Sequence, residues 1–150
     1  MASWITPVYD RTIADVNYAI AKIAEWRDTN SKDVYELKGC FNVSDINRIE
    51  GNIQYLSDNL SALYYFPHTR SMSWDNKGLP SIVDISRIMD NIKKIISSYF
   101  QYDTAPNLPE TMLNYEQVND VEENLYLLKE MLDNMKSMFR ECGTLICGEE

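Results

Sequence analysis

The sequence predicts an all-α fold, a four-helix arrangement built from two duplicated helical hairpins with long strapping loops. Three observations favour this fold. Four stretches begin with a helix N-cap signature, apolar residues then recur at helical spacing, and no stretch shows a convincing strand alternation apart from a short candidate at residues 144–147. The predicted helices cover residues 12–28, 43–66, 82–102 and 115–140.

Each predicted helix opens with a side chain that can cap it. In a capping box, the cap oxygen accepts a hydrogen bond from the third helical N–H, and the side chain at that third position bonds back to the cap N–H. The cap residues and their partners are Thr12 with Asp15, Asn42 with Asp45, Ser81 with Asp84, and Asn114 with Gln117. Phe41 and Leu113 precede two of these caps and are expected to pack on Ile46 and Val118 as hydrophobic staples.

Apolar residues follow each cap at positions +4, +7, +11 and +14, which fall in one stripe of a helix. This spacing predicts a buried seam on every helix, as in helix bundles. The seam residues are Val16, Ala19, Ile23 and Trp26; Ile46, Ile49, Ile53 and Leu56; Ile85, Ile88, Ile92 and Ile95; and Val118, Val121, Leu125 and Leu128. The predicted loops are longer than those of compact bundles, so they either lie as ordered straps over the helices or contact another molecule.

The four units are spaced as if a helical hairpin had been duplicated. Asp15 and Asp84 are 69 residues apart, and Asp45 and Gln117 are 72 residues apart. The strongest similarity joins residues 41–56 to residues 113–128. In these two segments Asn42, Asn47, Glu50, Asn52 and Leu56 recur as Asn114, Asn119, Glu122, Asn124 and Leu128. We therefore expect a single domain, residues 1–150, with internal repeats at about 1–66 and 67–140 and a tail at 141–150.

Composition excludes several classes of function. The net charge of −9 argues against nucleic-acid binding, which needs clustered Lys and Arg. No apolar run approaches the roughly 20 residues of a membrane span, so no membrane partner is expected, and the N-terminus shows no signal-peptide pattern. The three cysteines, Cys40, Cys142 and Cys147, are an odd number, which favours thiols in a reducing compartment over a disulfide framework.

No residue pattern predicts catalysis or a cofactor. His68 is the only histidine, and a lone loop histidine is typical of a surface position. Cys142 and Cys147 have no nearby His or further Cys pair to complete a zinc site. Asp103 and Glu110 flank the last loop without a spacing that favours shared titration or metal binding. We therefore expect no enzyme activity, no metal and no cofactor.

Asparagine recurs at +5 and +10 from the caps, on the two flanks of the predicted seam. Because a buried unpaired amide is costly, we interpret these residues and two cap asparagines as internal hydrogen-bonding groups. The candidate structural residues are Asn42, Asn47, Asn52, Asn91, Asn114, Asn119 and Asn124. Arg48 and Arg87 lie at +6, where they would form exposed ion pairs with Glu50 or Asp84, or contact another subunit.

Aromatic residues concentrate at the predicted helix ends and in the loops. Some would close the core beneath the loops, and the others would form an association surface, since Tyr and Trp dominate binding hot spots. Stacking on sugars is a competing use. The candidate interface residues, which include the two arginines, are Trp4, Arg48, Tyr64, Tyr65, Trp74, Arg87, Tyr99 and Tyr102.

The opening W-I-T-P-V-Y-D-R (residues 4–11) and the segment N-V-S-D-I-N-R-I-E-G-N-I-Q-Y-L (residues 42–56) resemble a module in small structural proteins of tailed phages and prophages of Gram-positive bacteria. In that family, an opening W-x-T-P-x-x-D-R precedes repeated N-R-I-E-x-N-I-x-Y-L helices. Residues 86–89, S-R-I-M, and residues 119–122, N-D-V-E, depart from N-R-I-E. The resemblance implies a tail- or baseplate-associated protein and transfers no catalytic residue.

The sequence therefore predicts a virion structural protein, an adaptor or decoration subunit that is made in the host cytoplasm and located in the tail. Its expected partners are other virion proteins and further copies of itself. Two alternatives stay open. One is a carbohydrate-binding module for host cell-surface glycans, and the other is a small cytoplasmic prophage regulator that binds one helix of a partner.

Overall fold

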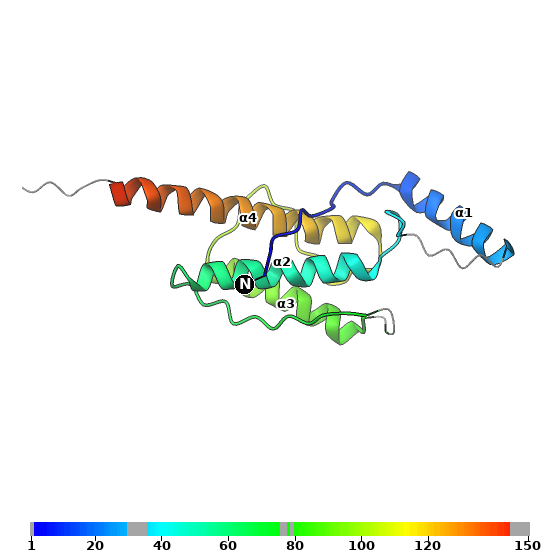
Figure 1. Ribbon diagram of the computed structural model, residues 1–150, viewed down its shortest axis with the longest axis horizontal. Helices are drawn as coiled ribbons and strands as arrows, with labels where there is room; N and C mark the ends of the chain where they lie inside the picture. Colours follow the sequence, from blue (N-terminus) through cyan, green and yellow to red (C-terminus); the bar gives the residue numbers. More distant parts are fainter. Residues whose placement is uncertain (1, 30–35, 76–77, 79, 145–150) are drawn as a thin grey trace, which may run out of the picture.

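The computed structural model describes residues 2–29, 36–75, 78 and 80–144. These residues form four α-helices and no strand, which confirms the predicted all-α class. Residues 145–147 of the strand candidate lie outside the described residues, and so does most of the predicted tail. The helices are α1 (Ile13–Thr29), α2 (Val43–Ser61), α3 (Ile82–Ser98) and α4 (Tyr115–Thr144) (Figure 1).

Helices α2, α3 and α4 form a bundle in which all three run in the same direction (Figure 1). Arg48 of α2 meets Glu122 of α4, and Asn59 meets Lys136 further along both helices. The rings of Tyr65 and Tyr99, which follow the C-terminal ends of α2 and α3, have centroids 5.2 Å apart. Helices α3 and α4, which were predicted to form the second hairpin, therefore run parallel to each other (Figure 1).

The connections permit parallel packing because each is long enough to return along a whole helix. Twenty residues join α2 to α3, and extended chain rises roughly 3.3 Å per residue against 1.5 Å in a helix. We call the extended segments that run back over the bundle straps. The first strap is residues 2–12, the second is residues 65–75, and the third is residues 99–113.

The predicted seams form the core of the bundle. Every seam residue of α2, α3 and α4 is buried except Ile85, which is partly buried and packs against the same core. Burial of each such side chain stabilises the fold by roughly 1.5–3 kcal/mol before entropic costs. In α1, by contrast, Ala19 is the one seam residue that is buried, and Ile23 is largely exposed. Helix α1 is thus a fourth copy of the unit that does not join the bundle.

Helix α1 projects beyond the end of the bundle where the other three helices begin (Figure 1). The chain segment that precedes α2 holds its start. Gly39 lies against the backbone of α1, where an added Cβ would be 2.1 Å from the carbonyl oxygen of Asp15, so no other residue fits. Lys38 pairs with Asp10 at 2.9 Å. These contacts fix where α1 starts but leave much of its length uncovered.

The predicted capping boxes are present with one variation. The backbone N–H groups of Thr12, Asn42 and Ser81 donate to the Asp three residues later, at 2.8, 2.8 and 2.9 Å. Hydrogen bonds from Ser81 lower the pKa of Asp84, and those from Thr12 lower the pKa of Asp15. In α4, Gln117 accepts instead from the N–H of Leu113. Leu113 is 86% exposed, so the predicted staple with Val118 is not formed.

Helix α2 ends at Ser61, five residues before the predicted end, in a Schellman motif. The N–H of Tyr65 donates to the carbonyl of Leu60, and the N–H of Tyr64 donates to that of Ser61. This motif requires a left-handed residue, usually Gly, and here Tyr64 takes that place with φ 66°. A Tyr in this conformation is strained, and its side chain is 87% exposed.

Replacing Tyr64 by Gly should therefore stabilise the protein by about 1 kcal/mol, because Gly adopts the left-handed conformation without a Cβ clash. Urea unfolding of the purified variant measures this change. Tyr65→Gly is the matched control, and it should destabilise the protein because the Tyr65 ring packs against the core. An unchanged or lower stability for Tyr64→Gly would contradict the strain argument.

Candidate functional site

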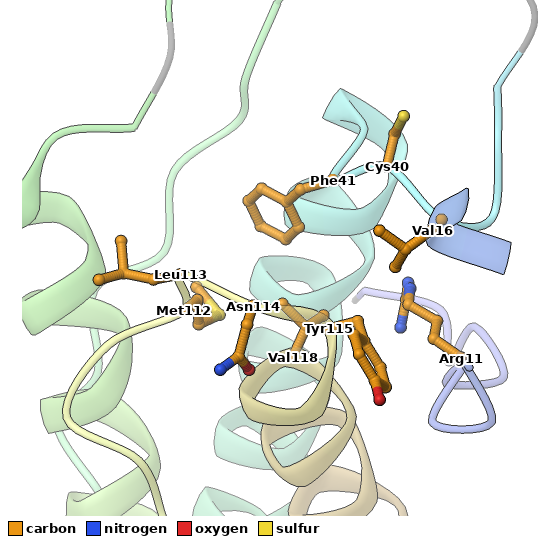
Figure 2. A pocket seen from close by; sticks show the side chains of 10 residues that line it. Arg11, Val16, Cys40, Phe41, Met112, Leu113, Asn114, Tyr115 and Val118 are labelled. Atoms are coloured by element: carbon orange, nitrogen blue, oxygen red, sulfur yellow. The ribbon is translucent and has the colours of Figure 1, made fainter. Parts of the chain in front are cut away.

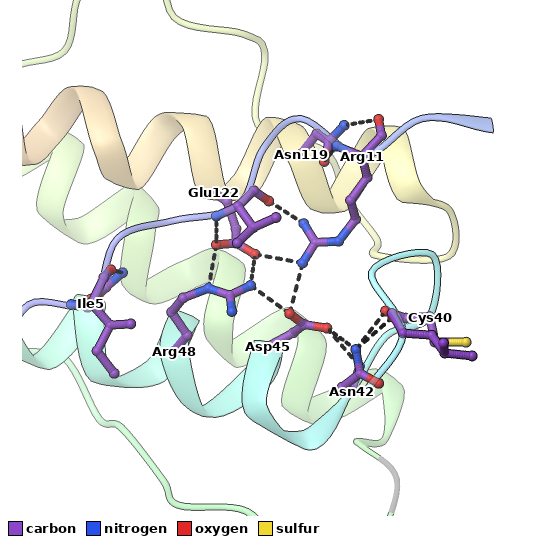
Figure 3. A network of polar contacts seen from close by, with 11 residues as sticks. Ile5, Arg11, Cys40, Asn42, Asp45, Arg48, Asn119 and Glu122 are labelled. Atoms are coloured by element: carbon purple, nitrogen blue, oxygen red, sulfur yellow. Dashed lines mark hydrogen bonds and ion pairs between the residues drawn. The ribbon is translucent and has the colours of Figure 1, made fainter. Parts of the chain in front are cut away.

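A buried network of four charged side chains lies where the first strap crosses α2 and α4 (Figure 3). Arg11 of the strap pairs with Asp45 at 2.8 Å and with Glu122 at 3.1 Å. Arg48 pairs with the same two carboxylates, each at 2.6 Å. Two positive and two negative charges therefore balance each other away from water, as buried charges must.

Glu122 is the centre of this network, and its side chain is completely buried. Each of its carboxylate oxygens accepts two hydrogen bonds. One oxygen accepts from Arg11 and Arg48, and the other accepts from Arg48 and from the backbone N–H of Val8 at 2.7 Å. This uses the full acceptor capacity of the carboxylate. The arrangement is chemically a clamp between a strap and two helices.

The charge balance also fixes the protonation of Arg48. Burial disfavours its charged form, but hydrogen bonds and charge from Glu122 and Asp45 outweigh that effect, so its pKa is raised above the ordinary value. A guanidinium that stays charged keeps both carboxylates neutralised.

A second clamp repeats this arrangement between α2, α3 and the second strap. Arg87 of α3 donates to both carboxylate oxygens of Glu50, at 3.1 and 2.5 Å. Glu50 also accepts from the backbone N–H of Met72 at 3.2 Å and from the indole N–H of Trp74 at 3.3 Å. Hydrogen bonds with Glu50 raise the pKa of Arg87. Glu50 of α2 thus binds α3 and the second strap, as Glu122 of α4 binds α2 and the first strap.

Asparagine side chains fix the straps at both sides of each clamp. Each amide oxygen accepts from a strap N–H, and the same amide nitrogen donates to the carbonyl of that strap residue. Asn52 pairs in this way with Ile5 at 3.0 and 2.7 Å, and Asn119 pairs with Arg11 at 3.2 and 2.9 Å. In the second strap, Asn91 holds Arg70 and Asn47 holds Trp74.

The positions of these groups explain the repeated sequence pattern. Each clamp lies in a groove between two neighbouring helices, and its residues can be numbered from the cap residue of their helix. One helix contributes the Arg at +6 and the Asn at +10. The other helix contributes the Glu at +8 and the Asn at +5. These two pairs of positions lie on opposite flanks of the seam. Arg48 and Asn52 face Glu122 and Asn119 across the first groove. An N-R-I-E-x-N segment therefore has one half of a clamp on each side of its helix.

The third groove, between α3 and α4, has a different chemistry. Asn124 still holds its strap, since it donates to the carbonyl of Pro106 at 2.9 Å and accepts from Gln101 at 2.9 Å. The other clamp positions carry Asp120, Met89 and Ser86 in place of Arg, Glu and Asn. Burial raises the pKa of Asp120, and the charge of Glu116 adds to this effect. The clamp is thus absent from this groove.

Exposed apolar side chains surround the end of the bundle from which α1 projects. Ile82 is 85% exposed and Leu113 is 86% exposed. Ile82 is the first residue of α3 and Leu113 precedes α4, and both helices are otherwise well packed. They line a groove of about 400 Å³ beside α3, together with Met89 and Met112. Val83 adjoins Ile82 and is also exposed.

The same surface continues into a cavity of about 260 Å³. Figure 2 shows Phe41, Met112 and Leu113 on one side of this cavity and Val16 and Arg11 on the other. Cys40 also lines it, and burial raises the pKa of the Cys40 thiol, with a further contribution from the charge of Asp45. We call the exposed residues Phe41, Ile82, Val83 and Leu113 the bundle-end patch.

The structure places most of the predicted interface residues inside the chain's own packing. Arg48 and Arg87 belong to the clamps, not to exposed ion pairs, because their carboxylate partners are buried. Trp4 contacts Tyr55, Tyr65 contacts Tyr99, and the hydroxyl of Tyr102 accepts from Asn134. Trp74 donates to Glu50. Tyr64 differs from the other seven in being almost fully exposed.

The predicted structural asparagines make hydrogen bonds within the chain. Five of them hold straps, as described above. Asn42 donates to the carbonyls of Leu37 and Cys40, and Asn114 accepts from the N–H of Gln117 at 2.8 Å. Sequence reasoning missed the clamp residues Arg11, Asp45, Glu50 and Glu122. The recurrence of Glu50 as Glu122, at a position beside the seam, was the signal that could have found them.

The comparisons with known proteins assign no family. No family model, no curated protein and no solved structure matches this chain. Within the described residues, no group of three or more His, Cys, Asp and Glu side chains is placed to hold a metal ion. None of the helices, over the part of the chain that is described, is long and apolar enough to cross a bilayer.

Proposed function

We propose that this chain is a virion structural protein, a tail- or baseplate-associated adaptor or decoration subunit that acts through protein–protein contacts. The resemblance of residues 4–11 and 42–56 to phage structural modules supports this proposal. In the structure, the N-R-I-E-x-N pattern within this segment supplies clamp residues that hold straps in place. A repeated module that fixes extended straps against helices suits a building block.

The bundle-end patch is the observation that carries the proposal. Ile82 and Leu113 expose nearly their whole side chains next to a groove and a cavity with apolar lining. Contiguous apolar surface of this kind marks protein-interaction sites in soluble proteins. Its proposed partner is another tail protein that inserts an apolar side chain at the groove. The proposed location is the tail of the virion, after synthesis in the host cytoplasm.

Mass spectrometry of purified phage particles tests the proposal directly. The chain should be found in particles at a constant ratio to other tail proteins after removal of loosely attached material. Its absence from intact particles, together with its presence in the host cytoplasm, would reject the proposal and favour the prophage regulator.

The double variant Ile82→Ser/Leu113→Ser should reduce co-sedimentation with tail particles at least tenfold. It should leave the melting temperature nearly unchanged, because both side chains are already exposed and surface substitutions typically change stability by about 0.5 kcal/mol or less. The control is Phe66→Ser/Met138→Ser, which removes two exposed apolar side chains away from the bundle-end patch. Equal losses of co-sedimentation in both variants would contradict a specific role for the patch.

One observation favours the carbohydrate-binding alternative. Tyr64 is exposed in a strained conformation, Phe66 is exposed two residues later, and Phe100 is exposed after α3. Strain retained at an exposed aromatic residue is a recognised mark of binding sites, and aromatic faces stack on sugars. Calorimetry with wall polysaccharide of the host, compared for the wild type and Tyr64→Gly, distinguishes this function from an adaptor role.

A further inference from the structure

Helix α1 carries an apolar stripe in which three isoleucines are exposed. Ile13, Val16, Ile20 and Ile23 follow the alternating spacing of three and four residues that defines coiled-coil a and d positions. Ile13 is 58% exposed, Ile20 is 62% exposed and Ile23 is 48% exposed. Val16 is partly buried at the cavity beside the bundle end.

Residues 37–39, which precede α2, lie on a different side of α1. Gly39 contacts the backbone at Asp15 and Val16, and Leu37 lines a depression with Tyr18, Lys22 and Trp26. Ala19 is buried, but the three isoleucines of the stripe are exposed. A 17-residue helix has little stability in water without tertiary packing of its apolar face. The stripe therefore needs a partner.

The charge distribution favours a second copy of the chain as that partner. The protein has a net charge of −9, so most surfaces of two copies repel each other. The stripe is an exception, because the residues that flank its a and d positions are Asn17, Ala19, Ala24 and Trp26, none of which is charged. Two or more α1 helices can approach along this face without bringing like charges together.

The stoichiometry follows from the residue types and from the repeated unit itself. Parallel coiled coils with β-branched residues at both a and d favour three or four strands over two. Within the chain, the cap-and-seam unit already packs as three parallel helices, α2, α3 and α4 (Figure 1). We propose that three copies of this protein associate through their α1 helices, which pack in parallel around the exposed Ile13, Ile20 and Ile23.

This proposal concerns contacts between copies and is independent of which tail proteins bind the bundle-end patch. Because α1 projects beyond the bundle (Figure 1), three bundles can surround the α1 helices. The stripe spans only two heptads, so the association should depend on protein concentration.

Sedimentation equilibrium of the purified protein, from micromolar to millimolar concentration, tests the proposal. As the concentration increases, the average mass of the wild-type protein should rise from the 17.5 kDa of one chain to three times that value. Ile20→Glu/Ile23→Glu should stay at the chain mass throughout. The matched control, Ala14→Glu/Ala21→Glu, adds the same charge at two exposed positions outside the stripe and should still form trimers. Circular dichroism checks that both variants keep the bundle folded.

A wild type that stays at the chain mass at every concentration would overturn the proposal. A limiting mass of two chains would overturn the threefold arrangement, and equal self-association of both double variants would overturn the role of the stripe. A monomeric protein that is nevertheless found in phage particles would reject this inference and leave the proposed virion function in place. A trimer that is absent from phage particles would support this inference and reject the proposed virion function.

Discussion

Replacing Glu122 by Gln is expected to destabilise the fold by about 3–5 kcal/mol, because it leaves two buried guanidinium groups with one carboxylate. Arg11 and Arg48 would both depend on Asp45, and the Gln amide nitrogen would be a donor facing other donors. Chemical denaturation of the purified variant measures the loss. An expected secondary effect is release of the first strap, since Glu122 also holds the N–H of Val8.

Glu130→Gln is the control for this experiment, because Glu130 is an exposed residue of the same helix. It should change the free energy of unfolding by roughly 0.5 kcal/mol or less. A second variant separates charge balance from the loss of a contact. Arg48→Met/Glu122→Met removes one charge of each sign and leaves Arg11 paired with Asp45. It should be more stable than Glu122→Gln, and a lower stability would contradict the explanation by charge balance.

Asn52→Asp is expected to cost about 2–3 kcal/mol although it changes only one amide to a carboxylate. The new side chain can still accept from the N–H of Ile5, but it cannot donate to the carbonyl of Ile5. An ionised carboxylate is also placed in a buried position, which is costly without a cation. Thermal unfolding at neutral pH measures the combined effect.

Asn107→Asp makes the same chemical change at an exposed position of the third strap and should have little effect. Amide hydrogen exchange gives a second readout for Asn52→Asp. Protection of the N–H groups of Ile5 and Val8 should fall, while protection within α3 should stay near the wild-type value, since the second strap has its own clamp. Equal loss of protection in both regions would indicate general destabilisation instead of release of one strap.

The sequence was most informative where burial alone determines the pattern. Ile49, Ile53 and Leu56 were predicted in one seam and are completely buried in the structure. This prediction was possible because helical periodicity indicates which face of a helix is buried. The capping boxes were equally predictable, since they involve residues only three positions apart. The direction of the helices was not predictable in this way. A tight hairpin and a returning strap leave the same apolar pattern on each helix.

The clamps and the exclusion of α1 depend on contacts between distant parts of the chain. Arg11 and Glu122 are 111 residues apart, and no local pattern relates them. The cap and seam of α1 resemble those of the other helices, although the small Ala19 takes the place of a larger seam residue and Ile20 takes the place of Glu50 or Glu122. These two substitutions remove core volume and a clamp partner, which fits the position of α1 outside the bundle.

The first strap places the earliest part of the chain between helices that are synthesised later. Its docking site needs Asn119 and Glu122, so a nascent chain that stops before α4 has no place for residues 8–11. Such long-range contacts form late in folding. Arg11 lies two residues before α1, so the strap contacts that lead into α1 form only after α4 has been synthesised. A chain truncated before α4 therefore lacks the buried carboxylate and the amide that hold the residues before α1 against the bundle.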